Sequence, residues 1–182
     1  MHPFKVINMM RVMRPVIKCN LNLIDLKQSL GGKYYAGRPH MLVIQMNNGR
    51  NIQIFKGGCI QILGRVSDED AESMRCELLQ RLNKNVDDDS ACFQLENILQ
   101  ENKFEIANIV LHIKLPNNVS LRNIKYTDSS LFYEVEIFPA ALIRKWSPAH
   151  LAVFSNGNVI LTGIRSLHEC EQLLAILCQY LP

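Results

Sequence analysis

Residues 132–165 read FYEVEIFPAALIRKWSPAHLAVFSNGNVILTGIR, and this stretch decides the fold. It contains three short apolar runs of a length typical of a β-strand, at 138–145, 150–154 and 159–163. Two turns separate the runs: Trp146-Ser147-Pro148, and Asn156-Gly157, which is a strong hairpin signal. The stretch therefore predicts three consecutive antiparallel strands.

This stretch has a second copy 99 residues earlier in the chain. Apolar and glycine positions coincide between the two copies, for example Phe55 with Phe154, Gly58 with Gly157 and Gly64 with Gly163. After each copy the apolar period changes from two to 3.6, and Ser67 and Ser166 each begin a capping pattern for an amphipathic helix. A self-match of two copies predicts a pseudo-twofold domain.

The first half of the chain follows this pattern, after a lead-in at 1–14 that gives no clear assignment. We expect a strand at 16–23, a short helix at 25–30, strands at 41–46, 51–55 and 60–63, and a helix from Ser67 to Asn83. The apolar face of that helix is expected to consist of Ala71, Met74, Leu78 and Leu82.

The second half begins after a linker that contains Asp87-Asp88-Asp89 and an extra helix at 92–102. A strand is expected at 104–115, and Ser166 and Glu169 form a capping box for the last helix. Its core face is expected to contain Leu167, Leu173, Leu174, Leu177 and Leu181. We predict a first repeat at 1–86, a linker at 87–103 and a second repeat at 104–182. The fold class is α+β, with a curved antiparallel sheet whose convex face carries the long helices.

Composition limits the classes of function. The net charge is only +3, with thirteen Lys and Arg against nine Asp and Glu in residues 1–89, which is a weak footprint for a nucleic-acid binder. Six cysteines form no C-x-x-C motif, which favours buried thiols in a reducing compartment. His168-Glu169-Cys170 is better explained by helix capping and packing than by a metal. No nucleophile elbow or phosphate loop occurs, so we predict no enzyme activity, no metal and no cofactor.

Several segments resemble the TATA-box-binding protein (TBP) family. Residues 133–139, YEVEIFP, resemble the family's Y-E-P-E-L-F-P-G segment, and residues 153–163, VFSNGNVILTG, resemble L-I-F-x-S-G-K-x-V-L-T-G. Residues 107–110, ANIV, resemble Q-N-I/M-V. The first half matches mainly through residues 24–27, Phe55, Gly58, Gly64 and the helix from Ser67. The resemblance implies the family's pseudo-twofold saddle.

The resemblance also implies a binding site, because the family binds the minor groove with its concave sheet face and wedges phenylalanines between base steps. The implied site residues are Phe138 and Phe154 as wedges, Asn108 as a groove reader, Thr162 near the groove floor, Arg144 on the DNA backbone, Leu142 and Ile160 lining the groove, and Phe55 with Met41 in the first repeat. The wedge partner of Phe55 falls near Pro39 or Met41. The asparagine that matches Asn108 falls within 13–15 and is lost.

Strand parity supports a concave position for these residues. If Leu151 and Val153 face the helices, Ala152 and Phe154 face the other side. The same alternation places Gln45, Gln53 and Gln61 on the concave face of the first repeat. A solvated polar face is the simpler interpretation of these glutamines, and donation to the acceptors of A·T pairs is the other.

We predict a TBP-like transcription-initiation factor that binds A·T-rich promoter DNA and recruits transcription machinery. The implied partners are double-stranded DNA and transcription factor IIB-like or IIA-like proteins or RNA polymerase, without a membrane, in the nucleus or at a viral transcription site. The alternative is a TBP-fold interaction subunit of a transcription complex, whose concave face contacts protein instead of DNA.

Overall fold

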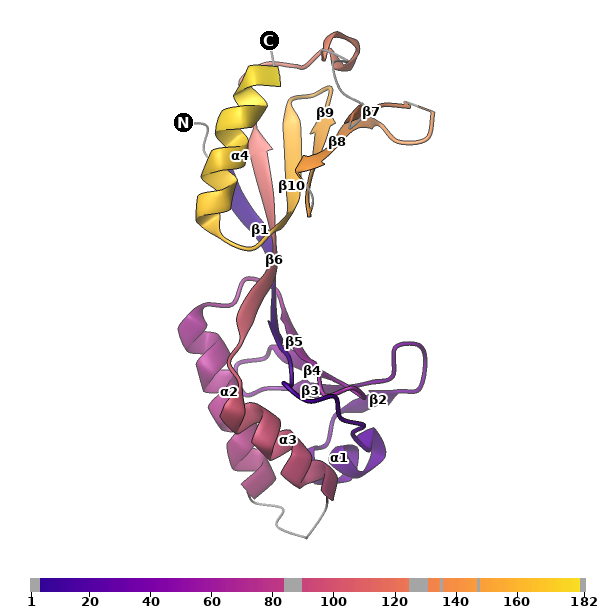
Figure 1. The fold of residues 1–182 in the computed structure, drawn as a ribbon, viewed down its shortest axis with the longest axis vertical. Coiled ribbons are helices and arrows are strands. Elements are labelled where there is room, and N and C mark those ends of the chain that lie inside the picture. The colour runs from indigo at the N-terminus through magenta and orange to yellow at the C-terminus, as the bar shows by residue number, and fades with distance from the viewer. Residues whose placement is uncertain (1–3, 84–89, 125–130, 135, 147, 181–182) are drawn as a thin grey trace. The chain divides into compact units, whose positions relative to one another are not determined.

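The fold was analysed in a computed structural model, which describes residues 4–83, 90–124, 131–134, 136–146 and 148–180. The described chain is α+β, and the eight strand pairs β1–β5, β10–β6, β10–β9, β2–β3, β3–β4, β4–β5, β7–β8 and β8–β9 are antiparallel. It divides into two compact units (Figure 1). The N-terminal unit is Met10–Glu105, and the C-terminal unit combines the chain up to Met9 with the chain from Ile106 onward.

The N-terminal unit packs three helices on one face of a small sheet. The strand order is β2-β3-β4-β5-β1, and β1 contributes its last residues here. The elements are β1 (Phe4–Met13), α1 (Leu23–Leu30), β2 (Lys33–Tyr35), β3 (Met41–Gln45), β4 (Asn51–Phe55), β5 (Ile60–Leu63), α2 (Asp68–Asn83) and α3 (Ser90–Glu101).

The C-terminal unit repeats the arrangement with a single long helix. Its strand order is β1-β6-β10-β9-β8-β7, and α4 lies on one face of these strands (Figure 1). The elements are β6 (Glu105–Lys114), the 3-10 helix η1 (Leu121–Asn123), β7 (Leu131–Phe132), β8 (Ala140–Trp146), β9 (Ala149–Phe154), β10 (Asn158–Ile164) and α4 (Leu167–Tyr180).

The predicted apolar face of α2 forms the centre of the N-terminal core. Ala71, Met74, Leu78 and Leu82 are all buried, and they pack with residues of α1, α3 and the sheet. The predicted cap is also present, because the Ser67 hydroxyl accepts a hydrogen bond from the Asp70 amide at 3.0 Å. The extra helix predicted at 92–102 is confirmed as α3, whereas Asp87-Asp88-Asp89 lies outside the described residues.

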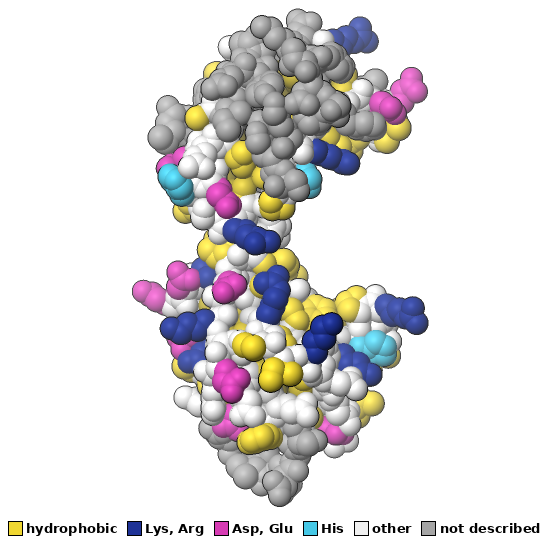
Figure 2. Space-filling view, in the orientation of Figure 1, with side chains coloured by type: hydrophobic (Ala, Val, Ile, Leu, Met, Phe, Trp, Pro, Cys, Tyr) yellow, Lys and Arg dark blue, Asp and Glu magenta, His cyan; other side chains and the backbone are white. Residues whose placement is uncertain are grey.

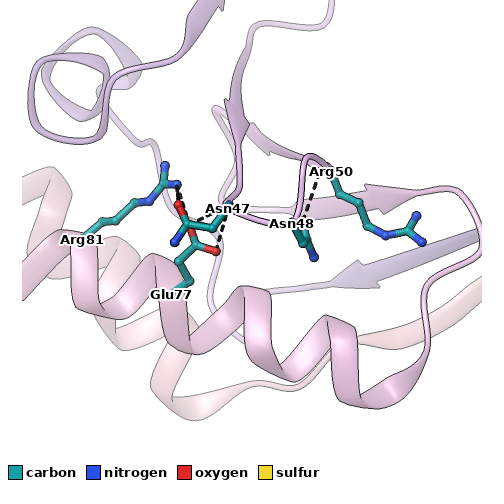
Figure 3. A network of polar contacts seen from close by, with 5 residues as sticks. All are labelled: Asn47, Asn48, Arg50, Glu77 and Arg81. Atoms are coloured by element: carbon teal, nitrogen blue, oxygen red, sulfur yellow. Dashed lines mark hydrogen bonds and ion pairs between the residues drawn. The ribbon is translucent and has the colours of Figure 1, made fainter.

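A polar network ties the turn between β3 and β4 to helix α2 (Figure 3). The Glu77 carboxylate accepts hydrogen bonds from the Asn47 amide at 3.0 and 3.2 Å and pairs with Arg81 at 2.5 Å. Within the turn, the Asn48 side chain accepts from the Arg50 amide at 3.0 Å. Helix α2 thus holds the β3–β4 hairpin in place through its turn.

The last helix begins with the predicted capping box. The Ser166 hydroxyl accepts from the Glu169 amide at 3.2 Å, and the Glu169 carboxylate accepts from the Ser166 amide at 3.3 Å. The predicted core face is partly wrong: Leu173 is buried, but Leu167 is 49% exposed and Cys170 is buried instead. Leu167 is the first residue of α4, where it is exposed at the end of the helix. The side chains of Leu174 and Leu177, and the whole of Leu181, lie outside what the structure describes.

The N-terminal strand of the first repeat lies upstream of its predicted position. Residues 4–13, left unassigned from the sequence, form β1, and the strand predicted at 16–23 is wrong. Val16 and Ile17 are exposed in the loop that follows Pro15. Leu21, at the end of this loop, and Leu23, the first residue of α1, are both buried. The apparent alternation therefore came from two different local structures.

The structure bears on the predicted burial of the cysteines and on the length of the helices. Cys92 and Cys170 are buried and form no disulfide, as predicted, but Cys76 is exposed and Cys19 and Cys59 are half-buried. Among the described residues, no helix is long and apolar enough to cross a membrane.

Candidate nucleic-acid interface

Each sheet has one face that no helix of its own unit covers, and we call it the open face of that unit. In the C-terminal unit, Leu151, Val153, Val159 and Leu161 are buried against α4, so their strand neighbours point to the other side. The C-terminal open face therefore consists of Asn108, Val110, His112, Leu142, Arg144, His150, Ala152, Phe154, Ile160 and Thr162. The parity predicted from the sequence is confirmed here.

Phe138 and Phe154 form an aromatic pair at one end of this face. Their ring centroids are 6.1 Å apart at an interplanar angle of 59°, and Phe138 is 38% exposed. Phe138 precedes β8 and is held in a turn in which its amide donates to the Glu134 carbonyl at 2.9 Å. Phe154 ends β9 opposite Ala140, whose small side chain leaves room for the second ring. Two partly exposed rings at the ends of neighbouring strands present an apolar wedge.

Asn108 is oriented by a bulge in the neighbouring strand. Its side-chain oxygen accepts a hydrogen bond from the Gly163 amide at 2.8 Å, next to the register shift in β10. Gly163 has a φ of 85°, and a Cβ there would lie 2.1 Å from the Pro148 carbonyl oxygen, so a glycine is required. With its oxygen engaged, Asn108 presents its amino group as a donor.

The remaining predicted residues of this unit line the centre and rim of the open face. Leu142, Ala152, Ile160 and His112 form one row across four strands by strand register. Thr162 pairs with His150 on the next row, and Arg144 is exposed on β8. The centre of the face is therefore apolar, with polar groups toward its margin.

The N-terminal open face follows the same parity with different chemistry. It consists of Met10, Val12, Lys33, Tyr35, Met41, Val43, Gln45, Asn51, Gln53, Phe55, Gln61 and Leu63. Its central row is Val43, Gln53, Gln61 and Val12, so two glutamines stand at the centre. The predicted position of Gln45, Gln53 and Gln61 is confirmed. Burial raises the pKa of the neighbouring Cys59 thiol, while Arg14 and a side-chain hydrogen bond with Gln61 oppose this rise.

Strand register settles which residue pairs with Phe55. Met41 lies opposite Phe55, as Ala140 lies opposite Phe154, with both members offset by 99 residues. Met41 is therefore the counterpart of Ala140, and by the same offset Pro39 is the counterpart of Phe138. On its other side Met41 pairs with Tyr35, so the row at this end of the N-terminal open face is Tyr35, Met41 and Phe55.

Sequence reasoning missed Asn8. Met13 pairs with Ile60 as Ile113 pairs with Val159, so β1 and β6 correspond at an offset of 100 residues and Asn8 is the counterpart of Asn108. The assignment of this position to residues 13–15 was wrong, because it depended on the misplaced strand. The signal was present, since Asn8 and Asn108 each precede two apolar residues. Asn8 is exposed, and its side-chain oxygen accepts from the Met9 amide at 2.9 Å.

Positive charge is concentrated in the strands and loops of the first half. Residues 1–67 contain ten Lys and Arg but one acidic residue, Asp25, and the next acids begin at Asp68 in α2. The face visible in Figure 2 shows many Lys and Arg side chains on the unit that carries β2–β5. The overall charge of +3 hides this division, because the helix layer carries most of the acids. Among the described residues, no cluster of three or more His, Cys, Asp or Glu could hold a metal ion.

Comparisons with known proteins agree with this geometry. The family model described as transcription factor TFIID (or TATA-binding protein, TBP) matches residues 103–182. TATA-box-binding protein 3 of Methanosarcina mazei is 29% identical over 150 residues, which cover 80% of this chain and 77% of that protein. The solved structure of Methanococcus jannaschii TBP matches with a TM-score of 0.67 and 21% identity over 97% of both chains. This structural likeness shows the fold, so the predicted TBP-like α+β fold is confirmed.

Proposed function

We propose, from the premise that this chain is a divergent TBP-like protein, that it is a transcription-initiation factor that binds A·T-rich promoter DNA through the minor groove. The observation that carries the proposal is the Phe138–Phe154 pair, 6.1 Å between centroids, at the end of an apolar sheet face. Apolar wedges of this kind insert between base steps and kink the duplex.

The neighbouring residues support the same contact. Asn108 presents amino hydrogens because the Gly163 amide occupies its oxygen, and A·T pairs expose only acceptors in the minor groove. Leu142 and Ile160 would contact the floor of the widened groove, with Thr162 beside them. Arg144 is exposed at the rim, where it would contact phosphate.

The N-terminal unit would contribute mainly through charge. Phe55 and Met41 would touch the groove without a paired second ring, whereas the basic strand and loop residues of this unit, between residues 14 and 65, would lie near the phosphates. This charge favours DNA over the alternative occupant, a protein segment on an apolar face. By likeness to the family, the protein would recruit IIB-like or IIA-like factors or RNA polymerase, and it would have no catalytic activity. A nuclear or viral transcription-site location stays a prediction.

The first test compares the wild type with Phe138→Ala/Phe154→Ala on an A·T-rich duplex. Fluorescence anisotropy at several salt concentrations would give affinity, and energy transfer between the duplex ends would give bending. We expect the variant to bind roughly tenfold to a hundredfold more weakly and to bend the duplex less, since an aromatic contact with a base contributes about 1–3 kcal/mol.

A matched control separates this effect from a general loss of apolar surface. Phe93→Ala/Leu167→Ala removes two side chains that are 65% and 49% exposed and lie on helices, away from both open faces. This control should bind and bend DNA like the wild type. Equal, unbent and salt-insensitive binding by all three proteins would contradict the proposal and direct the search to protein partners.

A further inference from the structure

The two open faces differ at one pair of facing positions in the centre of each sheet. In the C-terminal unit, Ala152 on β9 lies opposite Ile160 on β10. In the N-terminal unit, Gln53 on β4 lies opposite Gln61 on β5, at the same offset of 99 residues. Two apolar side chains are thus replaced by two primary amides at corresponding places.

The amide groups of these glutamines are available to a ligand. Both side chains are half-buried, and among the described residues no hydrogen bond to the side chain of Gln53 is formed. The Gln61 side chain has the Cys59 thiol as its one hydrogen-bond partner among the described residues, and a primary amide with one partner keeps a free N–H and a free oxygen lone pair. In Asn8 and Asn108, by contrast, the side-chain oxygen already accepts a backbone hydrogen bond.

A free amide oxygen needs a donor when the groove covers it. An A·T pair offers only the acceptors adenine N3 and thymine O2 in the minor groove, so the oxygen would lose water without gaining a partner. A G·C pair adds the guanine N2 amino group, which donates. A glutamine can accept from this amino group and donate to a neighbouring acceptor at once. The apolar pair Ala152 and Ile160 can do neither.

The rest of the N-terminal open face is consistent with binding to a base step that contains a G·C pair. The counterpart of Phe138 is Pro39, and Phe55 has a methionine rather than a second ring opposite it. On this face Met41 separates the rings of Tyr35 and Phe55, so they do not form a pair; the face is a weaker wedge and requires less deformation of the duplex than the Phe138–Phe154 pair. The face therefore lacks the feature that makes an easily kinked A·T step advantageous.

We propose that the Gln53–Gln61 pair makes the N-terminal unit select a G·C-containing half-site, by accepting the guanine N2 amino group in the minor groove. The C-terminal unit keeps the A·T-rich half. The protein would thus recognise a composite element, with one half of each base composition. This inference rests on the proposed function, minor-groove binding by the open faces.

The test changes only the minor-groove amino group. Three duplexes share one A·T half, and the other half is fully A·T, contains two adjacent G·C pairs, or contains the same pairs with inosine replacing guanine. Inosine lacks the N2 amino group but pairs with cytosine. Each duplex keeps one A·T half, so the C-terminal unit always has an A·T half to bind, and the protein can take the orientation that suits both of its units. Affinities would be measured by anisotropy for the full chain.

The test variant is Gln53→Ala/Gln61→Ile, which gives the N-terminal unit the residues that the C-terminal unit has at these positions. We expect the wild type to bind the G·C duplex about tenfold more tightly than the inosine duplex, and the variant to lose this preference. The control Gln94→Ala/Gln100→Ala removes two exposed glutamines of α3 and should keep it. Circular dichroism would establish that each variant is folded.

A reciprocal variant tests the inference if the first one fails to fold. Ala152→Gln in the C-terminal unit should relieve discrimination against a G·C pair in the second half of the site. Wild-type binding that is tightest on the fully A·T duplex, or equal on the guanine and inosine duplexes, would overturn the inference and leave the proposed function standing. Absence of binding to all three duplexes at low salt would overturn both.

Discussion

Arg11 is a charged side chain buried on the core side of β1, and its contacts predict a role in stability. Its guanidinium Nε donates to the Val66 carbonyl at 2.8 Å, and Nη1 pairs with Asp68 at 2.5 Å. The side chain of Arg11 is 5% exposed, whereas that of Asp68 is 89% exposed. The hydrogen bond to the buried carbonyl should therefore matter more than the ion pair.

We expect Arg11→Met to lower the free energy of unfolding by about 1–3 kcal/mol, because it leaves the Val66 carbonyl without a donor. Asp68→Asn should cost under about 1 kcal/mol, since exposed ion pairs contribute little. Urea titrations of both variants check this. Equal losses in the two variants would mean that the ion pair, not the carbonyl contact, carries the stability.

At the residue scale, the sequence predicted side chains well wherever strand parity was unbroken. Phe154, Leu142 and Gln53 lie on the faces that alternation assigned to them, because each belongs to a regular strand with one buried side. Asn8 could not be placed in this way. Its strand had not been located, and its match to Asn108 requires an offset of 100 rather than 99 residues.

At the scale of elements, the capping serines at the start of α2 and α4 should contribute equally to stability. Ser67 accepts from the amide of Asp70 at 3.0 Å, and Ser166 from that of Glu169 at 3.2 Å. Replacement of either serine by alanine should lower the free energy of unfolding by about 1 kcal/mol, because a donor of the first turn loses its partner.

Ser67→Asp and Ser166→Asp serve as controls, since aspartate also caps helices. Chemical denaturation of the four variants gives the comparison. A loss for the aspartate variants as large as for the alanine variants would attribute the effect to packing rather than to capping.

The long helices and hairpins could be predicted because their signals are local. A serine cap, a 3.6-residue apolar period and an Asn-Gly turn each depend on a few neighbouring residues. The strand β1 could not, since a mixed sequence with Lys5, Asn8 and Arg11 forms a strand only through its pairing with distant residues such as Leu63 and Ile62. The misassigned segment at 16–23 shows the converse, because alternation without a pairing partner does not make a strand.

For the whole molecule, the division of charge between layers has a consequence for DNA binding. In the N-terminal unit, α2 begins with an acidic first turn, whereas seven basic residues lie in β2 or in the turns and loops around the sheet: Arg14, Lys18, Lys33, Arg38, Arg50, Lys56 and Arg65. Net charge, which is all that composition gives, averages over this difference. Basic loops and turns around the sheet should attract phosphates and make binding strongly dependent on salt.

Lys33 tests this division of charge. It lies on the edge strand β2 in register with Val43 of the open face, with its ammonium 5.0 Å from the Tyr35 ring centroid. If it contacts one phosphate, Lys33→Met should reduce the slope of log K against log salt by about 0.9. Lys27→Met removes an exposed lysine from α1 in the helix layer and should leave the slope unchanged. Titrations on one duplex over a range of salt concentrations give both slopes. Equal slopes for the two variants would mean that phosphates do not follow the sheet side of this unit, and the groove contact would then rest on the C-terminal open face alone.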